Sequence, residues 1–336
     1  MLSVCIVAPY TKSETTFAAI QIAGWLRRIG LTVYFLSTTP VYPGIHRYWD
    51  NNAISVSNIS RRLDFVRLST HICFFDSDPL IKEKSKTKKT IFFPGWSWYW
   101  NKDYEVYLRE SDRVICLSHA MSDWLDLRYN DINKVWASIV SPDSLLVPKH
   151  GVLDHHSYNF LVYIPRSYEL DVSTDYASVF NVSNYKVRFS FVFEKSLSKP
   201  YRKQFNKLNA TQYKSYPTYK LGSLARQHDV VYIANTRHMY GSVFSMFNAY
   251  NTPIICNHVT PVLEHVPTNI GCIIPATAYE KPIPVSDICP SAFLNNLDYI
   301  CNNFAPWLKT IQDKQLVNLV HAQLMFEPFI RSEFNV

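Results

Sequence analysis

Short apolar runs alternate with longer amphipathic stretches along most of the chain. Residues 2–8 are almost continuously apolar, a pattern typical of a strand buried on both faces of a parallel sheet. Residues 17–29 then carry apolar side chains at helical spacing, and residues 31–37 form a second apolar run. Ser13 or a nearby threonine is a candidate N-cap for this helix, and Gly30 is placed to end it. The order strand, helix, strand predicts a right-handed crossover, with ligands at the carboxyl ends of the strands.

The same alternation returns further along the chain. We predict strands over residues 71–75, 90–93, 113–117, 160–166, 188–193, 230–235 and 254–257, with a new sheet starting near Ser157. The closing stretch, Phe293 to Ile330, has a helical pattern that we expect to break at Pro306 and Pro328. Because 336 residues exceed the usual size of one core, the expected fold is α/β with two domains.

The loop before Gly241 joins a strand to a helix. The apolar residues that follow recur at helical spacing, and Asn251-Thr-Pro253 stops the helix before the next strand. Such a unit places the backbone N–H groups around Gly241 and Ser242 at the edge of a parallel sheet, where the helix N-terminus can bind an anion. A bound phosphate ester is therefore one hypothesis, and an ordinary crossover with no ligand is the alternative.

This stretch resembles the donor-binding segment of retaining glycosyltransferases of the GT-B fold, which use nucleotide sugars. Tyr240, Gly241, Thr252 and Pro253 match the family pattern; the substituted positions are His238 and Met246, where the family has acids, and Asn251, where it has glycine. Two more segments are similar to the family in the same order along the chain, residues 111–125 and 144–154. The resemblance implies two Rossmann-like domains facing a central cleft: an acceptor-side domain over 1–155, a nucleotide-sugar domain over 156–310, and a helix over 311–336 that crosses back to the first domain.

The resemblance also implies where the donor and the chemistry lie. Cations would neutralise the donor diphosphate next to the helix start, and we assign to the donor Lys12, Arg166, Lys195, His238, Tyr240, Gly241 and Ser242. The catalytic candidates are His119, Asp78 and His238. A histidine at a helix start can exchange a proton, although an ordinary surface residue is the alternative for His119. Asp76 and Asp78 could order a sugar hydroxyl or form a turn ahead of Pro79.

Charge and aromatic content bear on the acceptor. The formal net charge is +7, and eight glycines leave no glycine-rich phosphate loop of the P-loop or dinucleotide type. A basic run followed by alternating tryptophans combines charge with stacking surfaces, as single-stranded nucleic-acid grooves do. A solvated loop and an apolar plug between domains are the alternatives. The acceptor-binding candidates are Glu14, Asp76, Lys86, Lys88, Lys89, Trp96, Trp98 and Trp100.

These observations combine into one expectation for function. The chain is expected to move a sugar, with retention, from a nucleotide sugar to a hydroxymethylated or otherwise modified pyrimidine in DNA, with the base extruded from the duplex as in phage enzymes of this kind. A transferase for an envelope or lipid-linked saccharide and a non-catalytic nucleotide- or sugar-binding module are the alternatives. No metal and no cofactor besides the donor co-substrate are expected.

The location of the protein follows from what the sequence lacks. No apolar run approaches the roughly 18 residues of a membrane span, and the N-terminal region carries no basic segment of a signal peptide. Seven scattered cysteines without a Cys-x-x-Cys spacing favour reduced thiols. We therefore expect a cytoplasmic protein, in the host cytoplasm if the protein is phage-encoded.

Overall fold

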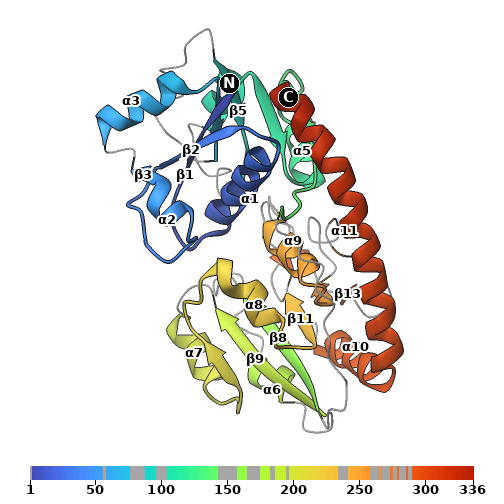
Figure 1. Cartoon of the computed structure of the whole chain (residues 1–336). Coiled ribbons are helices and arrows are strands. Elements are labelled where there is room, and N and C mark those ends of the chain that lie inside the picture. The colour runs from blue at the N-terminus through green and yellow to red at the C-terminus, as the bar shows by residue number, and fades with distance from the viewer. Residues whose placement is uncertain are drawn as a thin grey trace. The chain divides into compact units, whose positions relative to one another are not determined.

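The computed structural model describes most of the chain in two compact units (Figure 1). The first unit comprises Met1–Asp143, Met239–Ser242 and His321–Val336, and the second comprises Ser144–His238 and Val243–Val320. The described residues are 2–55, 58–75, 88–95, 104–142, 157–164, 175–181, 186–193, 197–233, 241–257, 264, 266, 273–274, 278–279, 285–286 and 290–336. Each unit is considered by itself below.

The first unit is built on a parallel sheet. Its described strands follow the order β3-β2-β1-β4-β5-β6-β7. Their bounds are β1 Ser3–Ala8, β2 Thr32–Ser37, β3 Ala53–Ser55, β4 His71–Phe74, β5 Lys89–Phe92, β6 Arg113–Cys116 and β7 Lys134–Trp136. The helices between them are α1 Glu14–Arg28, α2 Trp49–Asn52, α3 Ile59–Leu68, α4 Tyr104–Glu110 and α5 His119–Asp126. β1 is buried along its whole length, which confirms the prediction of a strand covered on both faces.

The second unit has a sheet of similar topology. Its described strands lie in the order β10-β9-β8-β11-β12-β13 and pair in parallel. Their bounds are β8 Tyr158–Ile164, β9 Val187–Phe193, β10 Thr211–Tyr213, β11 Val230–Ile233, β12 Ile254–Asn257 and β13 Ile273–Ile274, with an antiparallel pair formed by β14 Ala278–Tyr279 and β15 Val285–Ser286. The helices are α6 Tyr176–Phe180, α7 Lys199–Phe205, the short 3₁₀ helix η4 Thr218–Lys220, α8 Leu221–Ala225, α9 Ser242–Ala249 and α10 Pro290–Asn302, of which the first residue of α9 belongs to the first unit. α11, Phe304–Phe334, begins in the second unit and ends in the first.

The strand order reverses once in each sheet. In the first unit the chain moves outward from β1 through β2 to β3 and then returns to place β4 on the other side of β1. In the second unit β8 and β11 are related in the same way. Both units are therefore doubly wound, Rossmann-like sheets, as predicted. Ligands of such sheets bind at the carboxyl ends of the strands that flank the reversal.

The predicted breaks in the C-terminal helix are wrong. The helical stretch is interrupted at Asn303, between α10 and α11, and Pro306 lies within the first turn of α11. A first-turn residue has no internal N–H partner to lose, so proline is tolerated there. Pro328 lies inside α11 without ending it. The carbonyl that it leaves without a helical partner belongs to Leu324, a residue that is 68% exposed.

Candidate active site

β11, the strand that precedes α9, flanks the reversal point of the second sheet. β11 pairs with β8 on one side and β12 on the other. After the strand, Gly241 has a φ of 67°, in the left-handed region that favours glycine, and α9 begins at the next residue. Ser242 is fully buried, and no acidic residue lies in the first turn of α9. The predicted strand, helix and strand are thus confirmed. The N–H groups at the start of α9 can bind an anion, and the buried Glu14 carboxylate, 3.5 Å from the Ser242 hydroxyl, lies next to them.

The C-terminal end of α9 shows why the family's glycine can be replaced here. Asn251 has a φ of 51°, its N–H bonds to the Asn248 carbonyl, and the Thr252 N–H bonds to the Phe247 carbonyl. This pair of bonds is a Schellman motif, whose left-handed position accepts asparagine after glycine. The buried Gln315 of α11 donates to the Thr252 carbonyl at 3.2 Å and secures the same turn. The length and end of α9 are therefore fixed without the glycine.

Met246 belongs to the core of the second unit. It is 4% exposed and lies on the apolar side of α9 together with Val243, Phe244 and Phe247. A buried thioether offers no strong hydrogen-bond acceptor for a ribose hydroxyl. Any recognition of a donor ribose must therefore use other residues than the one at this family position.

Glu14 and Ser242 are brought together within the first unit, to which the structure assigns both. The Ser242 hydroxyl lies 3.5 Å from the Glu14 carboxylate, and Gln21 donates a side-chain hydrogen bond to the Ser242 carbonyl at 3.4 Å. All three residues are buried. Glu14 was predicted to bind the acceptor and Ser242 to bind the donor. The contact shows that these two residues are neighbours, and both roles remain predictions.

The loop after β1 holds a group of interlinked hydroxyls. Thr11 Oγ1 donates to Ser13 Oγ at 3.0 Å, and Ser13 Oγ accepts from the Thr16 N–H at 3.4 Å and so caps α1. The helix consequently begins at Glu14, which confirms Ser13 as the predicted N-cap. Lys12 is exposed within this loop, at the carboxyl-end edge of the first sheet. Its predicted contact with the donor remains a prediction.

Asp50 organises the loop after β2, a role that the sequence pattern did not reveal. Its carboxylate accepts from the Tyr10 hydroxyl at 2.7 Å and from the backbone N–H groups of Gly44, Ile45 and His46 at 2.9 to 3.2 Å. Burial tends to raise the pKa of Asp50, but the four hydrogen bonds outweigh it and hold the pKa below its ordinary value. The turn at the carboxyl end of β2 is therefore fixed by one ionised side chain.

We predict that Asp50→Asn destabilises the first unit at neutral pH and that this difference shrinks in acid. A carboxylate whose pKa is depressed by folding contributes stability above its unfolded pKa of about 3.9 and loses it as the pH falls through the folded value. Urea unfolding of both proteins between about pH 7 and about pH 3 measures the effect. Asp64→Asn is the control, because Asp64 is exposed on α3. The same pH dependence in both variants would contradict this role of Asp50.

His119 lies at the carboxyl-end edge of the first sheet, as predicted. It begins α5 directly after β6, and Ser118 caps the helix by accepting from the Met121 N–H at 3.2 Å. Its Nδ1 lies 2.9 Å from the Asp123 carboxylate, and its ring packs edge-on against Trp136. Asp123, one helical turn after His119, thus orients the imidazole at the helix start. Because the pair is more than half exposed, its catalytic role remains a prediction.

Lys88 and Lys89 have structural partners in the first unit, and their predicted contact with the acceptor remains a prediction. Lys88 precedes β5 and Lys89 begins it, on the amino-end edge of the first sheet, whereas ligands of such sheets bind at the carboxyl-end edge. Lys88 donates to the carbonyls of Val66, Arg67 and Ser69 and thereby caps the C-terminal end of α3. Sequence position beside the basic run suggested acceptor binding, but pairing of β5 with β4 turns both side chains toward structural partners.

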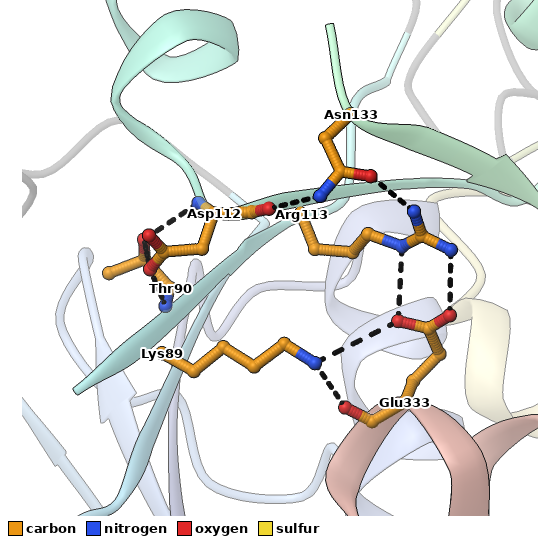
Figure 2. A network of polar contacts seen from close by, with 6 residues as sticks. All are labelled: Lys89, Thr90, Asp112, Arg113, Asn133 and Glu333. Atoms are coloured by element: carbon orange, nitrogen blue, oxygen red, sulfur yellow. Dashed lines mark hydrogen bonds and ion pairs between the residues drawn. The ribbon is translucent and has the colours of Figure 1, made fainter.

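Lys89 belongs to a polar network that secures the end of α11 (Figure 2). It donates to the Glu333 carbonyl at 2.7 Å, and Arg113 forms a two-bond ion pair with the Glu333 carboxylate at 2.9 and 3.1 Å. Asn133 links Arg113 to the Asp112 carbonyl, and the Asp112 carboxylate accepts twice from Thr90. The network joins β5, β6 and α11 within the first unit. This explains why a basic residue is needed at the start of β5.

Several predicted site residues lie outside the described part of the chain. They are Asp76, Asp78, Lys86, Trp96, Trp98, Trp100, Arg166, Lys195, His238 and Tyr240. Their roles remain predictions. Within the described residues, no group of three or more His, Cys, Asp and Glu side chains is placed to hold a metal ion.

Comparison with known proteins identifies the fold. No family model and no curated protein sequence matches the chain. Solved structures do match over nearly the whole length. A glycosyltransferase from Rickettsia africae is 13% identical, with a TM-score of 0.65 and 98% of each chain covered. An alpha-glucosyltransferase in complex with UDP and DNA containing an HMU base is 10% identical, with a TM-score of 0.61 and 96% of this chain and 95% of that chain covered. The chain has the GT-B fold.

A third structure with this GT-B architecture is HepE from Anabaena in complex with UDP and glucose. It is 10% identical, with a TM-score of 0.61, and 99% of this chain and 100% of that chain are covered. At such low identity the likeness establishes the arrangement of the chain and not its substrates. In the described parts of this chain, no helix combines the length and apolar character that a membrane crossing requires.

Proposed function

We propose that the chain is a glycosyltransferase that moves a sugar from a nucleotide-sugar donor, with retention, to a modified pyrimidine in DNA. The observation that carries the proposal is the turn at Gly241. It combines a left-handed glycine with the start of α9 at the strand reversal of the second sheet. GT-B structures of the same length that hold UDP or UDP with DNA support the assignment.

The chemistry requires stabilisation of a departing nucleoside diphosphate. The bond between the sugar's anomeric carbon and the phosphate oxygen breaks, a bond from that carbon to the acceptor hydroxyl oxygen forms, and the hydroxyl proton is released. Negative charge grows on the leaving phosphate oxygens, where fixed donors lower the barrier most effectively. We assign this stabilisation to Arg166, Lys195, Lys12 and the helix start at Gly241. His119, Asp78 and His238 are the candidates for contacts with the reacting sugar and for proton transfer.

The acceptor is assigned from charge and from the fold. The formal charge of +7 favours a polyanionic partner, because cations that replace counterions on phosphates supply sequence-independent affinity for nucleic acid. An alpha-glucosyltransferase of the same fold is bound to DNA that contains an HMU base. The acceptor candidates are Glu14, Asp76, Lys86, Lys88, Lys89, Trp96, Trp98 and Trp100. The nucleotide sugar is the co-substrate, with no metal or further cofactor, and a cytoplasmic location completes the proposal.

A panel of donors and acceptors tests this function directly. The full chain is incubated with individual nucleotide sugars and with a duplex that contains hydroxymethylated pyrimidines, and the nucleosides are then analysed by mass spectrometry. The expected product is a modified nucleoside heavier by one sugar, and its anomeric configuration by NMR should equal that of the donor. The same duplex without hydroxymethyl groups is the matched control.

Other products would select a different function. Transfer to a saccharide but not to the modified duplex would overturn the DNA assignment and keep the transferase. Binding of a nucleotide diphosphate without transfer to any acceptor would overturn the transferase and indicate a binding module. That second outcome is the one expected if His238 cannot replace the family acid.

A further inference from the structure

A cavity lies at the amino-end edge of the sheet in the second unit, opposite to the edge that carries Gly241. It has a volume of about 500 Å³ and is lined by the first residues of β8, β9 and β10 and by the loops next to them. This volume falls in the range of about 300–1,000 Å³ that is typical of small-molecule sites. The cavity lies wholly within one unit, so its shape does not depend on the placement of the other.

The polar side chains of this cavity are not used by the protein. Neither hydrogen bonds nor ion pairs to other parts of the chain involve the side chains of any of the six polar lining residues, all of which lie in the described part. They are Asn159, Asn181, Arg188, Ser190, Asn209 and Thr211. Each side chain is therefore available to a bound molecule.

The strand register gathers four of these side chains on one face of the sheet. Arg188 and Ser190 are two residues apart in β9, so their side chains point to the same face. Asn159 of β8 pairs with Arg188, and Thr211 of β10 pairs with Ser190. Paired positions on adjacent parallel strands are about 4.8 Å apart. A single small ligand can thus contact several of these groups at once.

The composition of the lining indicates the chemical class of the ligand. Among the described residues that line the cavity, Arg188 is the one charged residue and none is acidic. Carboxamides and hydroxyls both donate and accept hydrogen bonds, as sugar hydroxyls require. Phe180 and Phe189, which pack edge to face at 5.3 Å, are among the apolar residues of the lining. A guanidinium binds carboxylate or phosphate through two parallel bonds.

We propose that this cavity is a second binding site for a small anionic sugar, either a sugar acid or a sugar phosphate. The proposal does not depend on the transferase activity, because it rests on residues at the opposite edge of the sheet. Binding there would be independent of a nucleotide held near Gly241.

Calorimetric titration of the full chain tests the proposal. The probes are a hexose 1-phosphate, a hexuronate, the neutral hexose and inorganic phosphate, each with and without saturating UDP. We expect each anionic sugar to bind with the same affinity in the presence and absence of UDP. The neutral hexose and inorganic phosphate should each bind about tenfold or more weakly than the anionic sugars, because each makes only half of the contacts.

Three variants assign the binding to this cavity. Arg188→Gln should weaken anionic sugars about tenfold to a hundredfold, and Asn209→Trp, which changes an exposed loop residue at the rim, should block them. Lys203→Gln is the matched control, since it removes one positive charge from the exposed side of α7 outside the lining. Thermal unfolding confirms that each variant is folded. The proposal is overturned if saturating UDP abolishes binding of the anionic sugars, or if all variants bind them with equal affinity. It is also overturned if the neutral hexose binds as tightly as the anionic sugars, or if no probe binds.

Discussion

Gly241→Val should remove most of the affinity for a nucleotide-sugar donor, whereas Gly241→Asn should retain much of it. The φ of 67° at this position is open to glycine, accepted by asparagine, and strained for a β-branched residue. Forcing valine into this region costs about 1–3 kcal/mol. The chain can avoid that cost by moving the turn, which displaces the N–H groups at the start of α9. A donor phosphate bound there would lose its partners.

The measurement separates binding from folding. Titration with UDP and with UDP-sugars should show a loss of about tenfold to a hundredfold for the valine variant, which corresponds to about 1.4 kcal/mol for each factor of ten. Circular dichroism confirms that both variants keep their helices and strands. If the valine variant binds the donor as tightly as the natural protein, the phosphate does not lie on this turn. If both variants lose binding equally, a side chain of any kind blocks the approach, and strain is not the cause.

Local patterns in the sequence were sufficient to find the elements that surround this turn. The run before it is apolar because β11 lies between β8 and β12, buried on both faces. The apolar spacing after Gly241 is helical because one side of α9 packs into the core. The stop at Asn251 is encoded locally by a residue that tolerates positive φ. Each of these features depends on a few neighbouring residues, so one sequence reveals them.

Features that depend on distant partners were missed. Asp50 and Tyr10 are 40 positions apart, and nothing in the local sequence of either indicates their hydrogen bond. Lys89 was assigned by its basic neighbours, although its partner Glu333 lies 244 positions away. The short edge strands β3, β7 and β10 carry partly exposed side chains, so the hydrophobic pattern that reveals a buried strand is weak there. Prediction from one sequence therefore located the framework better than the roles of individual polar residues.

Gly222→Ala should destabilise the second unit when Tyr250 is present and stabilise it when the Tyr250 ring is removed. Gly222 lies in α8, and a Cβ added there would stand 2.1 Å from Tyr250 Cε2 and 2.5 Å from Cδ2. The ring lies beside the end of α9, with the Arg226 guanidinium 5.8 Å from its centre. Several ring atoms are too close at once, so the whole side chain must turn away. Gly222→Ala should therefore destabilise the protein by about 1–3 kcal/mol, the usual cost of overpacking.

The same substitution should have the opposite sign once the ring is removed. In a Tyr250→Ala background the added methyl group meets no ring, and alanine in a helix is favoured over glycine by up to about 1 kcal/mol. Denaturant unfolding of the two single variants, the double variant and the natural protein gives the coupling between the two positions. A coupling near zero would mean that Tyr250 swings aside without cost. A coupling of several kcal/mol, with Gly222→Ala destabilising the protein only when Tyr250 is present, would show that the Tyr250 ring packs tightly against α8 at Gly222.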